Sequence, residues 1–160
     1  MVEEKLVGGL ESAKLRKGLL SLGGYGIFVT SKRIIGVKAR GRFILRLFFE
    51  GLGAAFGNVP GALGLAGAFL SSLLADKLSA SQQAKLIEEL DEKKDFELGK
   101  GDVAELELRK PGIIRGLGHL LIRSSSGEKV KILIDADAKK EYECLKELLI
   151  AFKPEVLKLV

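Results

Sequence analysis

Short runs of apolar residues, separated by polar or glycine-containing breaks, occupy both ends of the chain. In the N-terminal part the runs are GLLSL (18–22), YGIFVT (25–30) and RIIGVKA (33–39), divided by Gly23-Gly24 and by Ser31-Lys32. Val, Ile, Phe and Tyr suit a pleated, half-buried surface, and breaks of this length are typical of β-hairpin turns. The pattern predicts a three-stranded antiparallel meander.

The C-terminal half repeats this pattern and then changes it. Apolar residues alternate with charged ones in VAELELR (103–109) and KVKILI (129–134), and GHLLIR (118–123) lies between them. Such alternation predicts strands with one buried side, and a short strand is also expected at FEL (96–98). From residue 138 to residue 152, apolar residues recur every three or four positions. This predicts a helix with Asp137 as its N-cap that stops before Pro154.

The residues between the two groups of strands follow another pattern. Two apolar segments, 43–57 and 61–78, meet at Asn58-Val59-Pro60, where proline lacks an amide hydrogen and disfavours helix in the residue before it. They predict a helical hairpin that bends near Asn58. Residues 80–95 then predict an amphipathic helix, with an apolar side formed by Leu86, Ile87 and Leu90. The whole insertion covers residues 43–95.

Composition indicates one basic, cysteine-poor domain over residues 1–160. The chain has 26 Lys and Arg against 21 Asp and Glu, a formal net charge of +5. This excess favours anionic partners such as phospholipid headgroups or nucleic acid. The single cysteine cannot form an internal disulfide, and the N-terminal residues lack the apolar core of a signal peptide, so we expect a cytoplasmic protein. Few amides and abundant Lys and Glu are typical of thermophile proteins.

No residue pattern of an enzyme is present. Cys144 has no His or acid at a catalytic spacing, and His119 is the only histidine, without other metal-ligand residues nearby. The string GLGAAFG (51–57) lacks the strand and helix alternation and the ribose-binding acid of a dinucleotide site. Nucleic acid is the weaker partner because no platform of aromatic residues flanked by cations is present. We expect no enzymatic activity, cofactor, metal or small-molecule substrate.

The segment YGIFVTSKRIIGVKAR (25–40) resembles a known family. A strand that ends in Thr30, the basic turn Ser31-Lys32-Arg33 and a strand that begins with Ile34-Ile35 look like the early hairpin of GRAM and of bacterial or archaeal pleckstrin-homology-like (PH-like) domains. The order of the later strands and the terminal helix agree with that family. The resemblance implies an α+β fold, a partly open antiparallel β-barrel capped by a C-terminal helix, here with a helical glycine-rich insertion between strands. It also implies a non-catalytic module that binds lipid headgroups, peptides or other proteins.

A row of cations follows this hairpin. Lys38, Arg40 and Arg42 are two residues apart, so on a continuing strand they project from one face and could hold a phosphate between them. The spacing looks like the basic signature with which some PH domains bind inositol phosphates, although Gly41 interrupts it. The other interpretation is a solvated strand edge, where Lys and Arg discourage unwanted pairing. Together with Arg33 and Arg46, these residues are the cations expected to meet anionic headgroups.

The uncharged stretch GLGAAFGNVPGALGLAGAFLSSLLA (51–75) is too apolar to face water, so we expect a cover from outside the barrel. Its six glycines and the central Asn58 and Pro60 disfavour a membrane span. In the leading hypothesis, aromatic residues of this region enter an anionic bilayer at the inner membrane face. In the alternative, glycines three or four residues apart pack against other copies and make a soluble homo-oligomer. The residues expected to insert or self-associate are Phe48, Phe49, Gly53, Phe56, Gly57, Gly61, Gly64 and Phe69.

Overall fold

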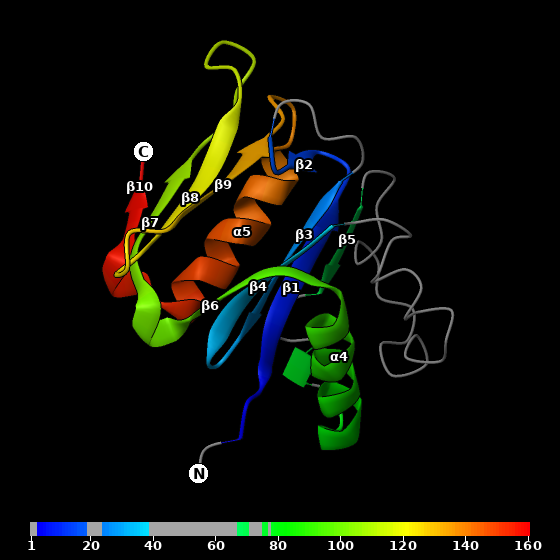
Figure 1. The fold of residues 1–160 in the computed structure, drawn as a ribbon. Helices are drawn as coiled ribbons and strands as arrows, with labels where there is room; N and C mark the ends of the chain where they lie inside the picture. The colour runs from blue at the N-terminus through cyan, green and yellow to red at the C-terminus, as the bar shows by residue number, and fades with distance from the viewer. Residues whose placement is uncertain (1–2, 19–23, 39–66, 71–74, 77) are drawn as a thin grey trace.

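Two five-stranded sheets make up the fold in the computed structural model, which describes residues 3–18, 24–38, 67–70, 75–76 and 78–160 (Figure 1). In spatial order the first sheet contains β5 (Gly67–Leu70), β1 (Leu6–Ser12), β3 (Tyr25–Thr30), β4 (Arg33–Lys38) and β6 (Lys94–Gly99), all antiparallel. The second contains β10 (Leu157–Leu159), β7 (Val103–Arg109), β8 (Gly118–Ser124), β9 (Lys129–Ile134) and β2 (Leu15–Arg16). In this sheet β10 is parallel to β7 and the other pairs are antiparallel.

The chain passes from the first sheet to the second at two corners, and it returns to the first sheet between β2 and β3. The first corner is the turn between β1 and β2, and the second is the short 3-10 helix η2 (Lys100–Asp102) between β6 and β7. At the second corner the Lys153 ammonium donates hydrogen bonds to the carbonyl oxygens of Lys100 and Val103, at 2.9 and 2.8 Å. The sheets are thereby held together by the backbone and by a side chain that follows the C-terminal helix.

The C-terminal helix α5 (Lys139–Phe152) lies between the two sheets (Figure 1). The apolar residues that predict it are buried, and Leu148 widens the stripe. Because this wide stripe packs into a core that includes residues of both sheets, the helix keeps the sheets apart. The predicted barrel is therefore wrong in this respect: the fold is a mixed α+β structure, as expected, but its sheets do not close into a barrel.

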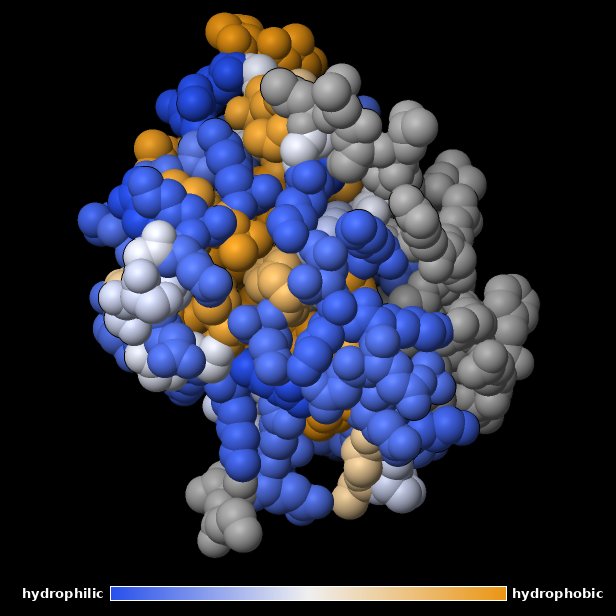
Figure 2. All heavy atoms as spheres, in the orientation of Figure 1, coloured by the Kyte–Doolittle hydropathy of each residue, from blue (hydrophilic) through white to orange (hydrophobic). Residues whose placement is uncertain are grey.

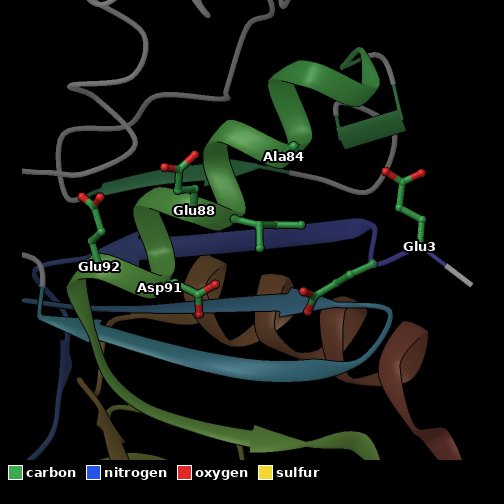
Figure 3. Close-up of a pocket in the computed structure, with 7 residues that line it drawn as sticks. Glu3, Ala84, Glu88, Asp91 and Glu92 are labelled. Atoms are coloured by element: carbon green, nitrogen blue, oxygen red, sulfur yellow. The ribbon is translucent and has the colours of Figure 1, made fainter. Parts of the chain in front are cut away.

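The helix α4 (Ala80–Lys93) covers the other face of the first sheet (Figures 1 and 3). Its predicted apolar side is largely correct, since Leu86 and Leu90 are buried and Ile87 is half-buried. Ser79 is the N-cap and forms a capping box, in which its hydroxyl accepts a hydrogen bond from the backbone N–H of Gln82. With a helix on each side, all six residues of β3 are buried. The strand β3 is therefore covered by α5 on one face of the sheet and by α4 on the other.

Several local predictions are corrected by the structure. Gly67–Leu70, predicted as part of a helix over 61–78, is strand β5, which pairs with β1 from Gly9 opposite Leu70 to Ser12 opposite Gly67. The unpaired edge of β1 supplies hydrogen-bond partners that a helix at this place would leave unsatisfied. Asp137 does not cap α5 either, because the N-cap is Ala138, and the Asp137 carboxylate instead accepts from Lys14 at 3.3 Å.

The insertion begins and ends at neighbouring strands. The chain leaves β4 at Lys38 and returns beside it at Lys94, which stands opposite Val37 in the pairing of β4 with β6. Between these two points, β5 forms the far edge of the same sheet. The predicted bend near Asn58, and residues 19–22 of the predicted strand GLLSL, lie outside the described residues. The strands predicted at 25–30, 103–109 and 129–134 are present with those bounds.

Candidate functional site

Arg33, a residue expected to meet headgroups, is held by three carboxylates of its own chain. At the start of β4 its guanidinium donates to Glu4 at 2.8 Å, to Asp91 in α4 at 2.6 Å, and to Glu97 in β6. The hydrogen bonds to Asp91 and Glu4 raise the pKa of Arg33, and Arg33 in turn lowers the pKa of Asp91 and Glu97. Only 16% of the Arg33 side chain is exposed. Its charge is therefore already matched within the fold.

An acidic groove adjoins this Arg33 cluster. It has a volume of about 510 Å³ and opens between the N-terminal segment and α4 (Figure 3). Its lining consists of Ala84, Ile87 and the carboxylate residues Glu3, Glu4, Glu88, Asp91 and Glu92. Such a lining repels anions. The groove is therefore unsuited to the phosphate or headgroup binding that the basic composition suggests.

Lys38 lies at the opposite end of β4 from Arg33, so the fold does not bring these two predicted residues together. Its side chain is 61% exposed, and its ammonium is 3.8 Å from the Asp95 carboxylate. Asp95 also accepts hydrogen bonds from Lys17 at 2.7 Å and from the Tyr25 hydroxyl at 2.6 Å. Burial, together with the bond to Asp95, raises the pKa of Tyr25. One carboxylate thus organises a small polar cluster and offsets part of the Lys38 charge.

The other predicted site residues fall almost entirely outside the described residues. Arg40, Arg42 and Arg46 are among them, as are the aromatic and glycine positions Phe48, Phe49, Gly53, Phe56, Gly57, Gly61 and Gly64. Phe69 is the exception, because in β5 it stands opposite Leu10 of β1. At this position the backbone belongs to the protein's own sheet, so the predicted helical hairpin does not extend this far.

The loop between β7 and β8, which the sequence pattern does not single out, presents a different surface. In KPGIIRG (110–116), Ile113 and Ile114 are 95% and 100% exposed. Hydrophobic atoms lie at the far end of this hairpin, with hydrophilic atoms next to them (Figure 2). Arg109, Lys110 and Arg115 are also exposed, and none of the three forms an ion pair with a described residue. We call residues 109–116 the hairpin tip.

The backbone closes the hairpin tip into a defined turn. Gly112 and Gly116 exchange two hydrogen bonds, with N to O distances of 3.1 and 2.7 Å. Residues 113–115 form the turn between them. Gly116 has a φ of +82°, in the left-handed region that glycine adopts without a steric penalty. The outermost residues are thus displayed on a closed loop.

The base of the loop is tightly packed. Pro111 is buried, and a Cβ added at Gly118 would lie 2.4 Å from the carbonyl oxygen of Arg109 and 2.8 Å from the Pro111 ring. Only glycine fits such a close approach. Pro111 restricts the backbone where the loop begins, and the close approach of Gly118 to Arg109 and Pro111 fixes the backbone where the loop ends. The orientation of the hairpin tip relative to the sheet is therefore set by its base.

Other reactive side chains have structural explanations. Burial raises the pKa of the Cys144 thiol to about 12, so little thiolate is present at neutral pH. The His119 Nε2 atom lies 2.6 Å from the Glu107 carboxylate on the neighbouring strand. In the part of the chain that the structure describes, no cluster of His, Cys, Asp or Glu is arranged to hold a metal ion. The expectation that the protein is not an enzyme stays a prediction.

Two further findings bear on the function. Neither of the described α-helices combines the length and the apolar composition required to cross a membrane. Comparisons with protein-family models, with curated protein sequences and with solved structures gave no match. The resemblance to PH-like domains therefore stays a prediction, and the case for a function rests on this chain's own residues.

Proposed function

We propose that this protein is a non-catalytic PH-like module that associates with anionic membrane surfaces. The observation that carries the proposal is the charge of the β7–β8 hairpin. From residue 108 to residue 127 the chain contains four cations and no Asp or Glu. Three of these cations, Arg109, Lys110 and Arg115, are exposed and form no ion pair with a described residue. An anionic surface is the partner that such a segment attracts.

The expected strength of this attraction is modest. Each Lys or Arg close to an anionic leaflet contributes about 1 kcal/mol, so three contribute about 3 kcal/mol. On its own, that corresponds to a dissociation constant in the millimolar range. The electrostatic part of the binding is therefore reversible and sensitive to salt, since exposed charges are screened. Lys38, with most of its side chain exposed, can add to it.

The charge distribution also favours one orientation. The helix α4, which lines the acidic groove, lies at the other end of the molecule from the β7–β8 hairpin (Figure 1). Repulsion turns the groove away from an anionic leaflet while attraction turns the hairpin toward it. A molecule whose positive and negative charges lie at separate ends adsorbs in a more defined orientation than one whose charges are spread evenly.

Self-assembly through residues 51–75 is the competing function. Gly67–Leu70 is the longest part of that stretch that the structure describes, and it pairs with β1 as a strand. The glycines of the predicted packing face, Gly53, Gly57, Gly61 and Gly64, lie outside the described residues. We prefer the membrane proposal because the charges that support it belong to a hairpin that the structure describes.

Flotation with lipid vesicles tests the proposal. Vesicles of phosphatidylcholine alone and vesicles that also contain phosphatidylglycerol are compared at low and high salt. We expect the protein to float only with the phosphatidylglycerol vesicles and to bind less at high salt. The triple variant R109Q/K110Q/R115Q should bind about 100-fold more weakly, which is the loss expected for about 1 kcal/mol per cation.

A matched control removes the same number of charges elsewhere. The variant K85Q/K129Q/K131Q changes three exposed lysines on α4 and β9, and it should retain most of the binding. If the intact protein does not float with phosphatidylglycerol vesicles even at low salt, the proposed function is wrong. If both triple variants lose the same amount of binding, only net charge matters, and the hairpin is not the contact surface.

A further inference from the structure

We infer that Ile113 and Ile114 insert into the bilayer and anchor the protein there, while Arg109, Lys110 and Arg115 lie among the lipid headgroups. This inference rests on the proposed membrane association and names the element that enters the lipid. It adds an apolar contribution to an attachment that would otherwise be electrostatic. The two contributions differ in their response to salt, so they can be measured separately.

The exposure of the two isoleucines is the first argument. They are almost completely exposed, whereas the other described isoleucines of the β-strands are buried. The other large hydrophobic residues exposed among those described, Ile150, Leu159 and Val160, are only about half exposed. In the isolated protein the side chains of Ile113 and Ile114 bury almost no apolar surface, so they do not stabilise the fold. An apolar medium that covers them strengthens binding by about 10- to 100-fold for each side chain.

The geometry of the hairpin tip is the second argument. The isoleucines occupy the first two positions of the closed turn, and Arg109 and Lys110 lie nearer to the sheet, at the end of β7 and just beyond it. This order matches a bilayer boundary, where apolar groups reach about 5–10 Å into the interface and long cationic side chains remain at headgroup level. Because the turn is already closed by two hydrogen bonds, binding does not have to order it.

Charge and area favour a lipid surface over a protein groove. In the sequence the isoleucines lie between Lys110 and Arg115, and residues 108–127 contain no Asp or Glu, which matches a leaflet that contains anionic lipid. A turn of this size buries far less than the ~1,000 Å² that a stable protein interface needs. A bilayer sets no such minimum, since it surrounds a protruding side chain on all sides. The observations therefore identify phospholipid as the occupant.

Removing the isoleucines is the first experiment. Vesicles with phosphatidylglycerol are titrated with intact protein and with I113S/I114S at low and high salt. We expect the variant to bind at least about 10-fold more weakly, with the larger proportional loss at high salt, where screening weakens the cations. The control I150S/V160S removes two half-exposed apolar residues from other places and should bind as the intact protein does. Circular dichroism verifies that both variants keep the fold.

A fluorescent reporter is the second experiment. The chain contains no tryptophan, so the variant I114W places a single indole at the hairpin tip, and I150W places one on α5 as the control. On adding phosphatidylglycerol vesicles, we expect the emission of I114W to shift to shorter wavelength and to be quenched by lipids brominated on their acyl chains. The emission of I150W should not change.

The outcomes separate the inference from the proposed function. If the intact protein does not bind the vesicles, the proposed function fails and the inference fails with it. If it binds, but I114W is not quenched and I113S/I114S binds unchanged, the inference alone is wrong. If the emission of I114W is already shifted without vesicles and shifts more as protein concentration rises, another copy covers the hairpin tip, and the lipid assignment is overturned.

Discussion

At the scale of single residues, the basic turn that carries the family resemblance has a structural role. The Thr30 hydroxyl donates to Glu4 at 2.6 Å and accepts hydrogen bonds from the backbone amides of Lys32 and Arg33, at 3.1 and 3.0 Å. The Arg33 guanidinium then joins the N-terminal segment, α4 and β6 through their carboxylates. A planar guanidinium can donate hydrogen bonds to several carboxylates in fixed directions, which a lysine ammonium cannot do. Sequence alone does not distinguish this role from headgroup binding.

Replacing Arg33 should destabilise the protein strongly. In Arg33→Gln, Glu4, Asp91 and Glu97 lose their shared cation. Among the described residues, only Asp91 and Glu97 keep a second one, Lys94, at 3.5 and 3.0 Å. Loss of one partner from a buried ion pair costs about 3–5 kcal/mol, and because two of these carboxylates are partly exposed we expect about 2–4 kcal/mol. The control Arg123→Gln removes a single pair with Glu105, in which the arginine side chain is 40% exposed, and should cost less than about 1 kcal/mol. Urea denaturation measures both changes.

The pH dependence provides a second measure of the same substitution. Arg33 lowers the pKa of Asp91 and Glu97 in the folded protein. Groups of this kind stabilise the fold above their unfolded pKa, about 4, and the stabilisation is lost as pH falls through the lower folded pKa. The intact protein should therefore lose stability more steeply below about pH 4 than Arg33→Gln does. Parallel curves for the two proteins would show that Arg33 does not stabilise these carboxylates.

At the scale of elements, hydrophobic pattern predicts the strands that alternate and misses those that depend on a neighbour. β7 alternates from Leu106 onward and β9 alternates throughout, and both have the predicted bounds. The pattern does not predict β1 because Gly8-Gly9 interrupts its apolar residues. In the fold, Gly9 lies against Phe28 of β3, where an added Cβ would be 2.3 Å from the ring. The short edge strands β5 and β10 form because β1 and β7 offer them partners. Such partners are visible only in three dimensions.

The same limit applies to the position of α5 and to the hairpin tip. The apolar stripe of α5 predicts a covered helix, but not that it separates two sheets. The two backbone hydrogen bonds between Gly112 and Gly116, which hold the exposed isoleucines on a closed turn, are likewise not visible in the sequence pattern. The sequence does contain a signal, since two adjacent isoleucines stand between glycines and after a proline. Those flanking residues are typical of a turn, in which apolar side chains have no sheet face to enter.

The pairing of β4 with β6 leads to a prediction about one glycine. Gly36 stands opposite Phe96, and an added Cβ would lie 2.0 Å from the aromatic ring. We expect Gly36→Ala to cost about 1–3 kcal/mol, because the ring must move away from its stacked position beside Tyr25. The control Gly101→Ala has no atom within 4 Å of its added Cβ and should change stability by less than about 0.5 kcal/mol. Urea denaturation compares the two, and equal effects would contradict the packing argument.

At the scale of the whole molecule, the separation of charge predicts how the protein sits on a membrane. The β7–β8 hairpin and α4 lie at different ends of the molecule (Figure 1). The first carries the cationic hairpin tip, and the second lines the acidic groove. With Cys144→Ser as background, a fluorophore is attached through Ile114→Cys or through Ala84→Cys, a position that lines the groove. On phosphatidylglycerol vesicles, a water-soluble quencher should still reach the label at residue 84 and should be excluded from the label at residue 114. Equal protection of both labels would contradict this orientation.

The adjacency of Lys38 and Lys94 at one end of the first sheet has an evolutionary consequence. A segment whose two ends are already held side by side can change in length at little cost, because each doubling of a flexible connection adds only about 0.6 kcal/mol of closure entropy. Mutation could therefore have lengthened or trimmed the residues between β4 and α4 while the strands on either side kept their register. Such changes must preserve β5, which pairs with β1. They must also preserve the pair Leu86 and Leu90, which is buried on the helix that covers the sheet. At this junction the chain can change in length while β4 and β6 stay paired.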